Sequence, residues 1–491
     1  MALRLYNTLS KREEDFCPLR REVVTMYTCG PTVYGRPHIG NYSSYLMADL
    51  VRRWLEAGHG YTVKHVKNIT DVGHLVADAD TGEDKVEKEA KRIAEEKRGQ
   101  GAVVTMEDVL AVAEMYTEQF IDDERALKIL EATERPRASR YVPQMITMIE
   151  ALIAKGHAYE TDDGVYFDVG TFKDYGQLSG NTLDKLNAGA RVAVDEQKKH
   201  PADFALWKKC VGSNASHVLR WASPWGEGFP GWHIECSAMS SALLGEQIDL
   251  HTGGEDNIFP HHECEIAQSE CSSHKKPFVR HWLHKRHIDL AGGKMSKSLG
   301  NVIGIPDIRA KGYSPMDLRY LLLSVHYRTN LKFTFDSLDS ARKVRLKIVE
   351  WISELRARSS KTVPRPATGE PPSSGHLERF TEAMNSDLNT PAALAEIFGA
   401  MNAYYAACEK GLFFKEDARE FLTFVDLIER TLGCFAPETF IVPANVQALL
   451  DERASARATK DFKASDRLRD EIKALGYEVR DEGKEQKVRR M

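Results

Sequence analysis

The alternation of apolar and polar residues in the first seventy positions predicts a parallel strand–helix–strand unit. An apolar run over Val23 to Thr28 is typical of a buried strand, and after a Gly/Pro-rich turn apolar residues recur at helical spacing from Tyr42 to Leu55. The next stretch, YTVKHVKNIT, is a second strand that ends at Thr70. This order predicts an α/β fold with a Rossmann-type parallel sheet, in which ligands bind at the carboxyl ends of the strands.

Changes in composition divide the rest of the chain. The pattern indicates an insertion between about residues 75 and 230. This interval contains a charged segment over 76–101, an amphipathic helix that opens at Thr105, and short β-type runs among Gly, Asn and Asp turns. From about residue 338 the pattern is almost purely helical, apart from a Pro/Ser/Gly-rich stretch over 359–375. We expect a catalytic α/β domain over 1–310 that includes the insertion, then a helical region over 311–358, a linker over 359–375, a helical domain over 376–450 and a tail over 451–491.

Composition narrows the class of protein. Hydrophobic residues make up 42% and charged residues 28% of the chain, and no apolar run approaches the roughly 20 residues of a membrane span, so we expect a globular protein that does not enter membranes. Eight cysteines are scattered over 491 residues, which favours reduced thiols in a cytoplasmic protein over a disulfide framework.

Charge limits the expected partners. A formal net charge of −5 argues against indiscriminate binding of nucleic acids. Residues 451–491 differ from the whole chain, because they hold twelve Lys and Arg against ten Asp and Glu. The net charge leaves room for local basic surfaces, and the tail has a net charge of +2.

A first phosphate-binding candidate lies where the first strand's loop meets the helix, in the sequence HIGN (His38 to Asn41). A helix N-terminus there offers unpaired N–H groups to a polyphosphate. Gly40 permits close approach of a ligand, and the His38 imidazole can donate to a phosphate oxygen. Taken alone, the motif is better explained as a helix cap.

A second candidate is the glycine-flanked stretch GGKMSKSLGN, which holds Lys294, Ser296, Lys297 and Ser298. Two ammonium groups with neighbouring hydroxyls suit the charge that develops on a departing pyrophosphate. A solvated lysine-rich turn would explain this stretch in isolation. Both motifs, in this order on an α/β frame, favour nucleotide chemistry.

In these two motifs the sequence resembles the class I aminoacyl-tRNA synthetases, with a complete KMSKS and with Asn41 in place of the usual histidine of the first motif. The resemblance implies ATP-dependent activation of an amino acid and its transfer to the terminal ribose of a tRNA, with Mg²⁺ accompanying ATP. It implies catalytic roles for His38, Asn41, Lys294 and Lys297, and ATP binding by His38, Gly40, Lys297 and Ser298.

Metal-binding chemistry is concentrated in FPHHECEIAQS, residues 259–269. In a helix, His261 and Glu265 share a face and can hold one ion while His262 points elsewhere, although His261 with Cys264 is an equally good pair by geometry. A zinc site usually needs four ligands, and Cys29 and Cys236 are the thiols beside other candidate segments. Periodicity does not choose among these cysteines, and a helix whose histidines cap or form ion pairs would explain the stretch by itself.

Four segments together closely resemble the cysteinyl-tRNA synthetase family: TCGPTVYGRPHIGN, PGWHIECSAMS, LHTGGEDNIFPHHECEIAQS and KMSKSLGN. The resemblance implies one Zn²⁺ per chain held by Cys29, Cys236, His261 and Glu265, with the thiol of the substrate cysteine joining the metal. The choice of Glu265 over Cys264 rests on the resemblance. Pocket roles are expected for Thr70, Trp232, His251 and Asp256.

A zinc ion would explain amino-acid selection without an editing domain. The metal deprotonates and binds a thiol, whereas the hydroxyl of serine is a harder and poorer partner. Pocket shape alone discriminates similar apolar side chains by only about 1–3 kcal/mol. We therefore expect selectivity for cysteine to depend on the metal.

The tail also resembles the anticodon-binding region of this family, in its KDF, SDRLRDEI and GYEVRD elements, although the tryptophan common near GKEQKVRR is absent. The region over 311–358 would contact the tRNA stem. Together the resemblances imply ATP-dependent ligation of L-cysteine to tRNA(Cys) through cysteinyl adenylate, by a cytoplasmic monomer.

Three alternatives remain open at this stage. A ligase that joins cysteine to an amino sugar would share the zinc and both signature motifs, but it has no use for the long helical C-terminal half. A nucleotidyltransferase would explain HIGN and leave the zinc ligands without a function. A zinc-stabilised RNA-binding protein would lack catalysis. Cysteine-dependent exchange of pyrophosphate into ATP would distinguish it from the ligases. The acceptor, a tRNA or an amino sugar, would distinguish the two ligases from each other.

Overall fold

The computed structural model describes residues 2–73, 75, 83–183, 185, 197–290, 293–294, 302–365, 375–436, 444–482 and 485–490. The chain forms two compact units, Met1–Phe435 and Ala436–Met491.

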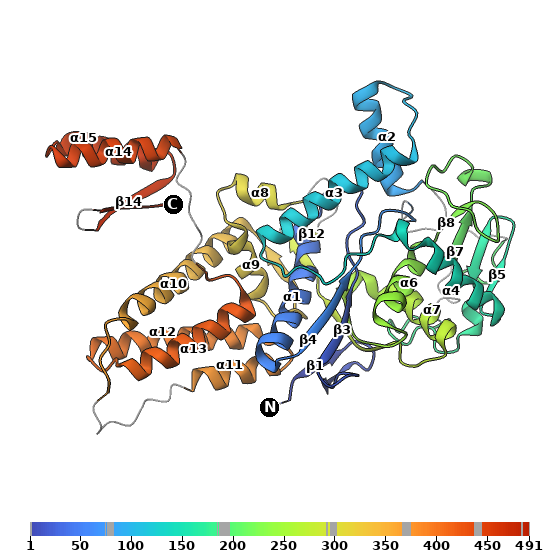
Figure 1. Ribbon diagram of the computed structural model, residues 1–491, viewed down its shortest axis with the longest axis horizontal. Coiled ribbons are helices and arrows are strands. Elements are labelled where there is room, and N and C mark those ends of the chain that lie inside the picture. Colours follow the sequence, from blue (N-terminus) through green and yellow to red (C-terminus); the bar gives the residue numbers. More distant parts are fainter. Residues whose placement is uncertain are drawn as a thin grey trace. The chain divides into compact units, whose positions relative to one another are not determined.

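A four-stranded parallel sheet forms the centre of the first unit. Its strands are β3 (Val23–Thr28), β4 (Thr62–Lys67), β9 (Ile248–Gly254) and β10 (Val279–Lys285), in the order β10-β9-β3-β4. Helix α1 (Ile39–His59) connects β3 to β4, as the hydrophobic pattern predicts (Figure 1). The Rossmann-type α/β fold is thereby confirmed.

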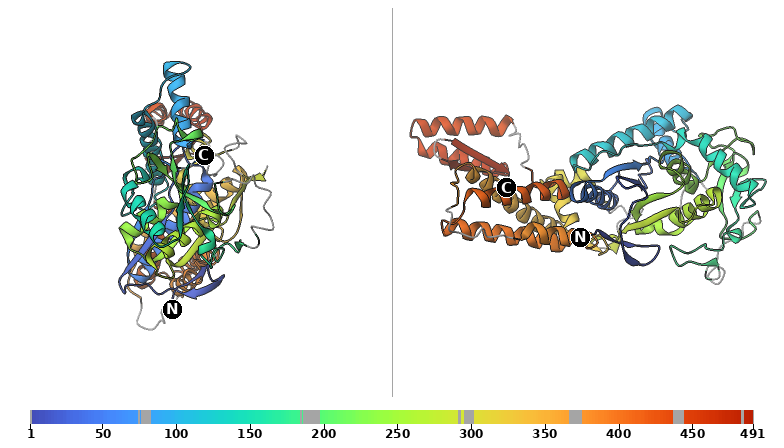
Figure 2. Two further views of the ribbon diagram at one scale, coloured as in Figure 1. Left: turned by 90° about the vertical axis from the view of Figure 1, so that its right-hand side faces the viewer. Right: turned by 60° about the horizontal axis from the view of Figure 1, so that its bottom comes forward.

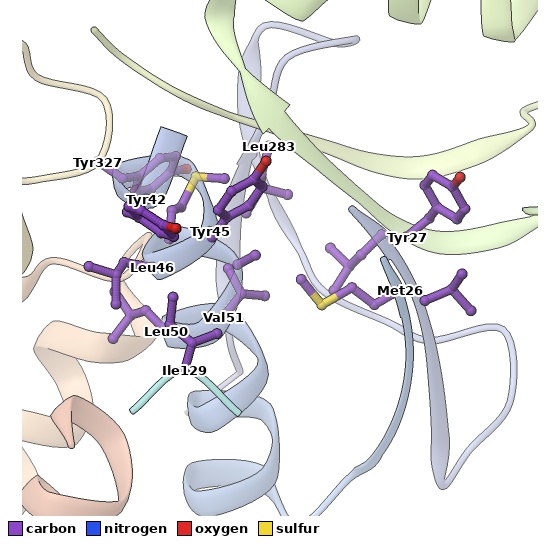
Figure 3. Packing of buried hydrophobic residues seen from close by; sticks show 14 of the residues in the cluster. Met26, Tyr27, Tyr42, Tyr45, Leu46, Leu50, Val51, Ile129, Leu283 and Tyr327 are labelled. Carbon is purple, nitrogen blue, oxygen red and sulfur yellow. The ribbon is translucent and has the colours of Figure 1, made fainter. Parts of the chain in front are cut away.

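Burial explains why these residues form the sheet and the helix. Val24 and Met26 of β3 are fully buried, and Leu46 and Leu50 of α1 are at most 3% exposed. Each such side chain contributes roughly 1.5–3 kcal/mol when it is removed from water. Figure 3 shows this cluster from close by, with residues of β3 and α1 among its members.

The segment between β4 and β9 begins and ends with helices and contains a second sheet. Its second helix opens at Thr105, as the sequence predicts, and Thr105 forms a capping box with Asp108. The segment contains α2 (Lys85–Arg98), α3 (Met106–Ala126), α4 (Val142–Ala154), an antiparallel sheet of β5 (Ala158–Glu160), β6 (Gly164–Phe167), β7 (Phe204–Lys209) and β8 (Gly228–Pro230), and α6 (Trp232–Leu244).

Helix α7 (Glu263–Ser273) joins β9 to β10, and the chain then forms a small sheet of β11 (Ile288–Leu290), β12 (Gly293–Lys294) and β13 (Leu331–Phe333) in the order β12-β11-β13. The remaining helices of the first unit are α8 (Ile305–Ala310), α9 (Pro315–Leu323), α10 (Phe335–Ser359), α11 (His376–Asn385), α12 (Thr390–Glu409) and α13 (Lys415–Leu432). Helix α13 packs against α1, so the helical domain over 376–450 adjoins the helix that follows His38 of HIGN (Figure 2). The hairpin of β1 (Arg4–Asn7) and β2 (Arg12–Asp15) packs beside β10.

The second unit has its own small core. Helices α14 (Ala444–Ala458) and α15 (Phe462–Ala474) pack with the hairpin of β14 (Tyr477–Glu482) and β15 (Glu485–Arg490) around Val446, Ile472 and Val479. Residue 451, at which the sequence places the start of the tail, lies inside α14. Among the residues that the structure describes, no helix combines the length and apolar character needed to cross a membrane.

Candidate active site

The HIGN motif forms the cap of α1. His38 Nδ1 accepts a hydrogen bond from the Gly40 N–H at 3.1 Å, and the His38 N–H donates to Asn41 Oδ1 at 3.0 Å. A Cβ atom on Gly40 would lie 2.8 Å from His38 Cε1, closer than real contacts allow. Glycine at this position therefore lets the imidazole fold over the first turn of the helix.

The same residues also line a cavity. His38, Gly40 and Asn41 form part of the wall of a cavity of about 210 Å³, together with Cys29, Gly30, Ser44, Tyr45, Gly254, Asp256, Asn257, Lys285, Arg286, His287 and Ile288. This cavity lies at the carboxyl ends of β3, β9 and β10, where a parallel sheet binds its ligands. The structure shows that HIGN caps the helix, and the position of its residues on the cavity is compatible with the predicted binding of a ligand.

Charged groups are concentrated at the β10 side of the cavity. Arg286 pairs with Glu255 at 2.6 Å, and Glu255 also accepts from the His287 N–H at 2.7 Å. The imidazole Nε2 of His287 lies 3.2 Å from Asp256. Lys285 is only 4% exposed, and burial lowers its pKa to about 8 although the nearby Glu255 opposes the shift.

Next to the cavity, the four predicted zinc ligands come together. One ligand atom each of Cys29, Cys236, His261 and Glu265 lies within 4.8 Å of the others. Cys29 Sγ is 3.9 Å from Cys236 Sγ and 3.5 Å from Glu265 Oε1, and His261 Nε2 is 3.0 Å from Glu265 Oε1. Cys29 directly follows β3, Cys236 lies in α6, His261 lies in the turn before α7, and Glu265 lies in the first turn of α7.

A second set of donors overlaps with the first. Cys29 and Glu265 also cluster with His251 and His262, again within 4.8 Å. The expectation that His262 points elsewhere is wrong, since its Nε2 lies 3.3 Å from Cys29 Sγ. His261 and His262 lie in a wider turn before α7, and Cys29 approaches from another strand, so both imidazoles reach the cluster.

Neighbouring rings orient the His261 side chain. Its Nδ1 hydrogen bonds to His233 Nδ1 at 3.0 Å, which leaves Nε2 facing the cluster. Trp232 stacks on the same ring with centroids 4.4 Å apart. Such outer partners fix the orientation of metal-ligating histidines. No pattern in the sequence points to His233, because its partner becomes a neighbour only after folding.

The electrostatics of the cluster favour the ionised forms of Cys236 and Glu265 and the protonated form of Cys29. Burial opposes ionisation of Cys236, but the hydrogen bond with Cys29 and the neighbouring His261 lower its pKa to about 6. Burial likewise opposes ionisation of Glu265, yet His251 and His261 lower its pKa to about 2. For Cys29, burial and the neighbouring Cys236 raise the pKa of the thiol.

The chemistry of these donors fits zinc. Two thiols, an imidazole and a carboxylate form a four-ligand set of the kind that Zn²⁺ takes in tetrahedral coordination, whereas Mg²⁺ and Ca²⁺ prefer oxygen ligands alone. The set Cys29, Cys236, His261 and Glu265 contains both thiols and is the softer of the two.

The other predicted site residues have different surroundings. Thr70 is buried and donates to Glu235 Oε2 at 3.0 Å, and His251 is buried and lies 2.9 Å from Glu265 Oε2. Asp256 lines the cavity. The backbone of Lys294 pairs with Asp289 between β11 and β12, and Lys297 and Ser298 lie outside the described residues.

Comparison with known protein families gives three matches. Residues 15–343 match the tRNA synthetases class I (C) catalytic domain. Residues 379–413 match the DALR domain, and residues 442–489 match the cysteinyl-tRNA ligase anticodon binding domain.

Individual relatives match along nearly their whole length. The chain is 42% identical to a cysteine–tRNA ligase of Thermus thermophilus over 496 residues, which covers 98% of each chain. It is 39% identical over 493 residues to the cysteine–tRNA ligase of Chlorobium chlorochromatii, again with 98% of both chains covered. The fold is similar to that of Mycobacterium tuberculosis methionyl-tRNA synthetase in complex with methionyl-adenylate, with a TM-score of 0.60, 16% identity, and coverage of 84% of this chain and 92% of that one.

Proposed function

The chain belongs to the cysteinyl-tRNA synthetase family of class I synthetases, and on that premise we propose that it ligates L-cysteine to tRNA(Cys) through a cysteinyl-adenylate intermediate, with zinc selecting the substrate thiol. The alternative acceptor, an amino sugar, receives no support from the match of residues 442–489 to an anticodon-binding domain.

The position of Cys29 is the observation that supports this proposal most. Cys29 belongs to the donor cluster and also lines the cavity beside His38 and Asn41. A group that recognises sulfur and a pocket that suits a nucleotide therefore share one residue. Such proximity is what an enzyme needs to bring an amino acid and ATP into reacting geometry.

In the first reaction, a carboxylate oxygen of cysteine attacks the α-phosphorus of ATP, the bond between the α- and β-phosphates breaks, and pyrophosphate leaves. His38 and Arg286 would hold the phosphates. The N–H groups of Ile39 and Gly40, which the sequence predicts to be unpaired, instead donate to the Ile303 carbonyl and to His38 Nδ1. Lys294, Lys297 and Ser298 would stabilise the charge on pyrophosphate, with Mg²⁺ bound to ATP. No side-chain nucleophile is required.

In the second reaction, a hydroxyl of the terminal ribose of tRNA attacks the carbonyl carbon, and AMP leaves. Thr70, Trp232, His251 and Asp256 would line the amino-acid and ribose pockets. Trp232 covers His261, and His251 holds Glu265, so both would also order the cluster.

Zinc would be held by Cys29, Cys236, His261 and Glu265. A bound zinc ion binds a thiolate strongly and a hydroxyl poorly, which is the basis for selection of cysteine over serine. Within the chain, burial of Cys236, His261 and Glu265 to 2% exposure or less excludes competing water.

We assign recognition of the tRNA anticodon to the unit Ala436–Met491. The side chains of Arg467 and Arg469 on α15 are 70% and 47% exposed, and exposed arginines suit phosphate contacts. Arg453 has a structural role instead, since it is fully buried and hydrogen bonds to Asp481 at 2.9 Å and to Gln486.

Two assays test the proposal. Purified protein should catalyse exchange of labelled pyrophosphate into ATP that depends on cysteine and not on serine, and it should charge tRNA(Cys). Deletion of residues 436–491, at the boundary of the second unit rather than inside α14, should abolish charging and preserve exchange. Charging that survives this deletion, or transfer of cysteine to an amino sugar instead, would refute the assignment. Cytoplasmic location and a monomeric state stay predictions, to be checked by fractionation and light scattering.

A further inference from the structure

The turn between α11 and α12 has an unusual backbone. Asp387 and Leu388 both have φ of 54°, in the left-handed region that is unfavourable for residues with a Cβ atom. Both are buried, with 2% and 1% exposure. A strained backbone of this kind persists only where its surroundings hold it, and it is concentrated at functional positions.

Asp387 holds the turn that follows α9. Its carboxylate accepts hydrogen bonds from the Tyr6 N–H at 2.8 Å, from the Tyr327 hydroxyl, and from Arg328 Nε at 2.6 Å. Its backbone carbonyl accepts from His326 Nε2 at 2.8 Å. A carbonyl can only accept, so His326 carries its proton on Nε2, and its Nδ1 accepts from the Arg328 N–H at 3.2 Å. One aspartate thus fixes three successive residues.

The same turn holds the wall of the cavity. The carbonyl of Tyr327 accepts from the Arg286 N–H at 3.0 Å, and the carbonyl of His287 accepts from the Leu331 N–H at 3.2 Å. Ile288 pairs with Leu331 where β11 and β13 meet. Arg286, His287 and Ile288 line the cavity next to HIGN. A single layer of backbone therefore separates the Asp387 contacts from the predicted nucleotide.

We propose that Asp387 is a positioning residue for ATP. It fixes the turn His326–Asn330, and through this turn it sets the backbone of Arg286 to Ile288 relative to the first turn of α1. The inference rests on the proposed function, because it takes the cavity as the nucleotide site. It extends that function to a residue of the helical domain over 376–450, outside the catalytic motifs.

Asp387→Asn is the sharpest test. Asparagine has the same size and tolerates positive φ, but it removes the charge and presents N–H groups where Arg328 now donates. In cysteine-dependent pyrophosphate exchange we expect KM for ATP to rise about tenfold while KM for cysteine changes less than about twofold, because a small displacement of the wall affects only its own ligand. Zinc content should stay unchanged. Tyr327→Phe removes one donor and should change KM for ATP in the same direction by a smaller factor.

Asp203→Asn is the matched control. Asp203 is 1% exposed and accepts from the Tyr159 hydroxyl at 2.7 Å and from the N–H groups of Val169 and His200 at 3.0 Å, all in the inserted sheet or the segments that join its strands. This variant should lose stability without a change in KM for ATP.

The outcomes are separable. A normal KM for ATP in Asp387→Asn, with only a smaller fraction of active enzyme, would overturn the proposal, and so would an equal rise in Asp203→Asn. Calorimetric titration of ATP without cysteine tests the same point by binding alone. A wild-type protein that binds ATP but shows no exchange would refute the proposed function and leave the role of Asp387 measurable.

Discussion

The donor cluster and the cavity proposed for the nucleotide share Cys29 but are built in opposite ways. Three of the four cluster donors, Cys236, His261 and Glu265, are almost completely buried. The two thiols, Cys29 and Cys236, come from segments that are more than two hundred residues apart in the sequence. The cavity takes its His38, Gly40 and Asn41 from a single turn of α1 and is lined by charged groups of β10 and its loop. A buried set of paired donors suits permanent binding of a metal, whereas a polar cavity suits a charged substrate that must enter and leave.

Substitution of Cys236 by serine should break the cluster without affecting the cavity. We expect kcat/KM for cysteine to fall about 10³-fold, because a hydroxyl is a poor zinc ligand and sites built around a polar handle discriminate strongly. Bound zinc should fall in parallel, and KM for ATP should change little. Mass spectrometry of the metal and pyrophosphate exchange measure these effects.

Cys264→Ser provides the control for this substitution, since Cys264 is fully buried one position from Glu265 but contacts the Tyr175 hydroxyl at 3.5 Å. It should retain zinc. Equal losses in both variants would mean that the effect comes from packing.

The pair His261→Ala and His262→Ala decides between the two donor sets. If the set with both thiols holds zinc, His261→Ala should lower kcat/KM for cysteine about 100-fold and reduce the zinc content, because the loss of one ligand weakens the binding of the metal. His262→Ala should retain the metal, because His262 also hydrogen bonds to His284 and would act as a neighbour only. The reverse order of zinc loss would assign the site to Cys29, His251, His262 and Glu265.

Gly40→Ala should affect the cavity and leave the cluster intact. The added methyl group would displace the His38 imidazole, and we expect KM for ATP to rise roughly 30-fold with normal zinc content. Gly399→Ala is the control, because a Cβ there would lie 2.7 Å from Cε1 of His376, which is in the helical domain and outside the cavity. Unchanged ATP kinetics in Gly40→Ala would remove HIGN from the nucleotide site.

Lys285→Met should give the smallest effect, on stability and its dependence on pH. Burial lowers the pKa of Lys285 from 10.5 to about 8 in the folded state, so below pH 8 the fold holds a buried charge. As pH rises from 8 to 10.5 the unfolded chain binds more protons than the folded one, and the wild type gains stability. We expect Lys285→Met to be about 1 kcal/mol more stable than the wild type at pH 7, a gain that is limited because methionine cannot make the weak hydrogen bond to the Thr329 carbonyl. This advantage should be lost above pH 10.5, where Lys285 is neutral in both the folded and the unfolded chain. Urea unfolding at several pH values measures this difference, and a difference independent of pH would contradict the assigned pKa.

Local patterns predicted much of the catalytic half. The apolar run of β3 and the helical spacing of α1 are consequences of burial along short segments, and both appear in the structure. HIGN was expected either to cap the helix or to bind phosphate, and the structure shows the cap and places the same residues on the cavity. The predicted direction of the His262 side chain was wrong. Helical periodicity describes the faces of one helix and does not include Cys29, which follows β3 and approaches His262 from outside that helix.

Sequence information was sufficient for the fold class and the family, since these depend on local periodicity and on motifs of consecutive residues. The resemblance also predicts four zinc ligands, whose ligand atoms lie within 4.8 Å of one another in the folded chain, and their binding of zinc stays a prediction. Three features became visible only in the folded chain: a second donor set overlaps with the first, Cys29 joins the cluster to the cavity, and Asp387 holds the cavity wall. Contacts of this kind form between segments up to several hundred residues apart, and their distances depend on how strands, helices and turns pack, which no single stretch of sequence specifies.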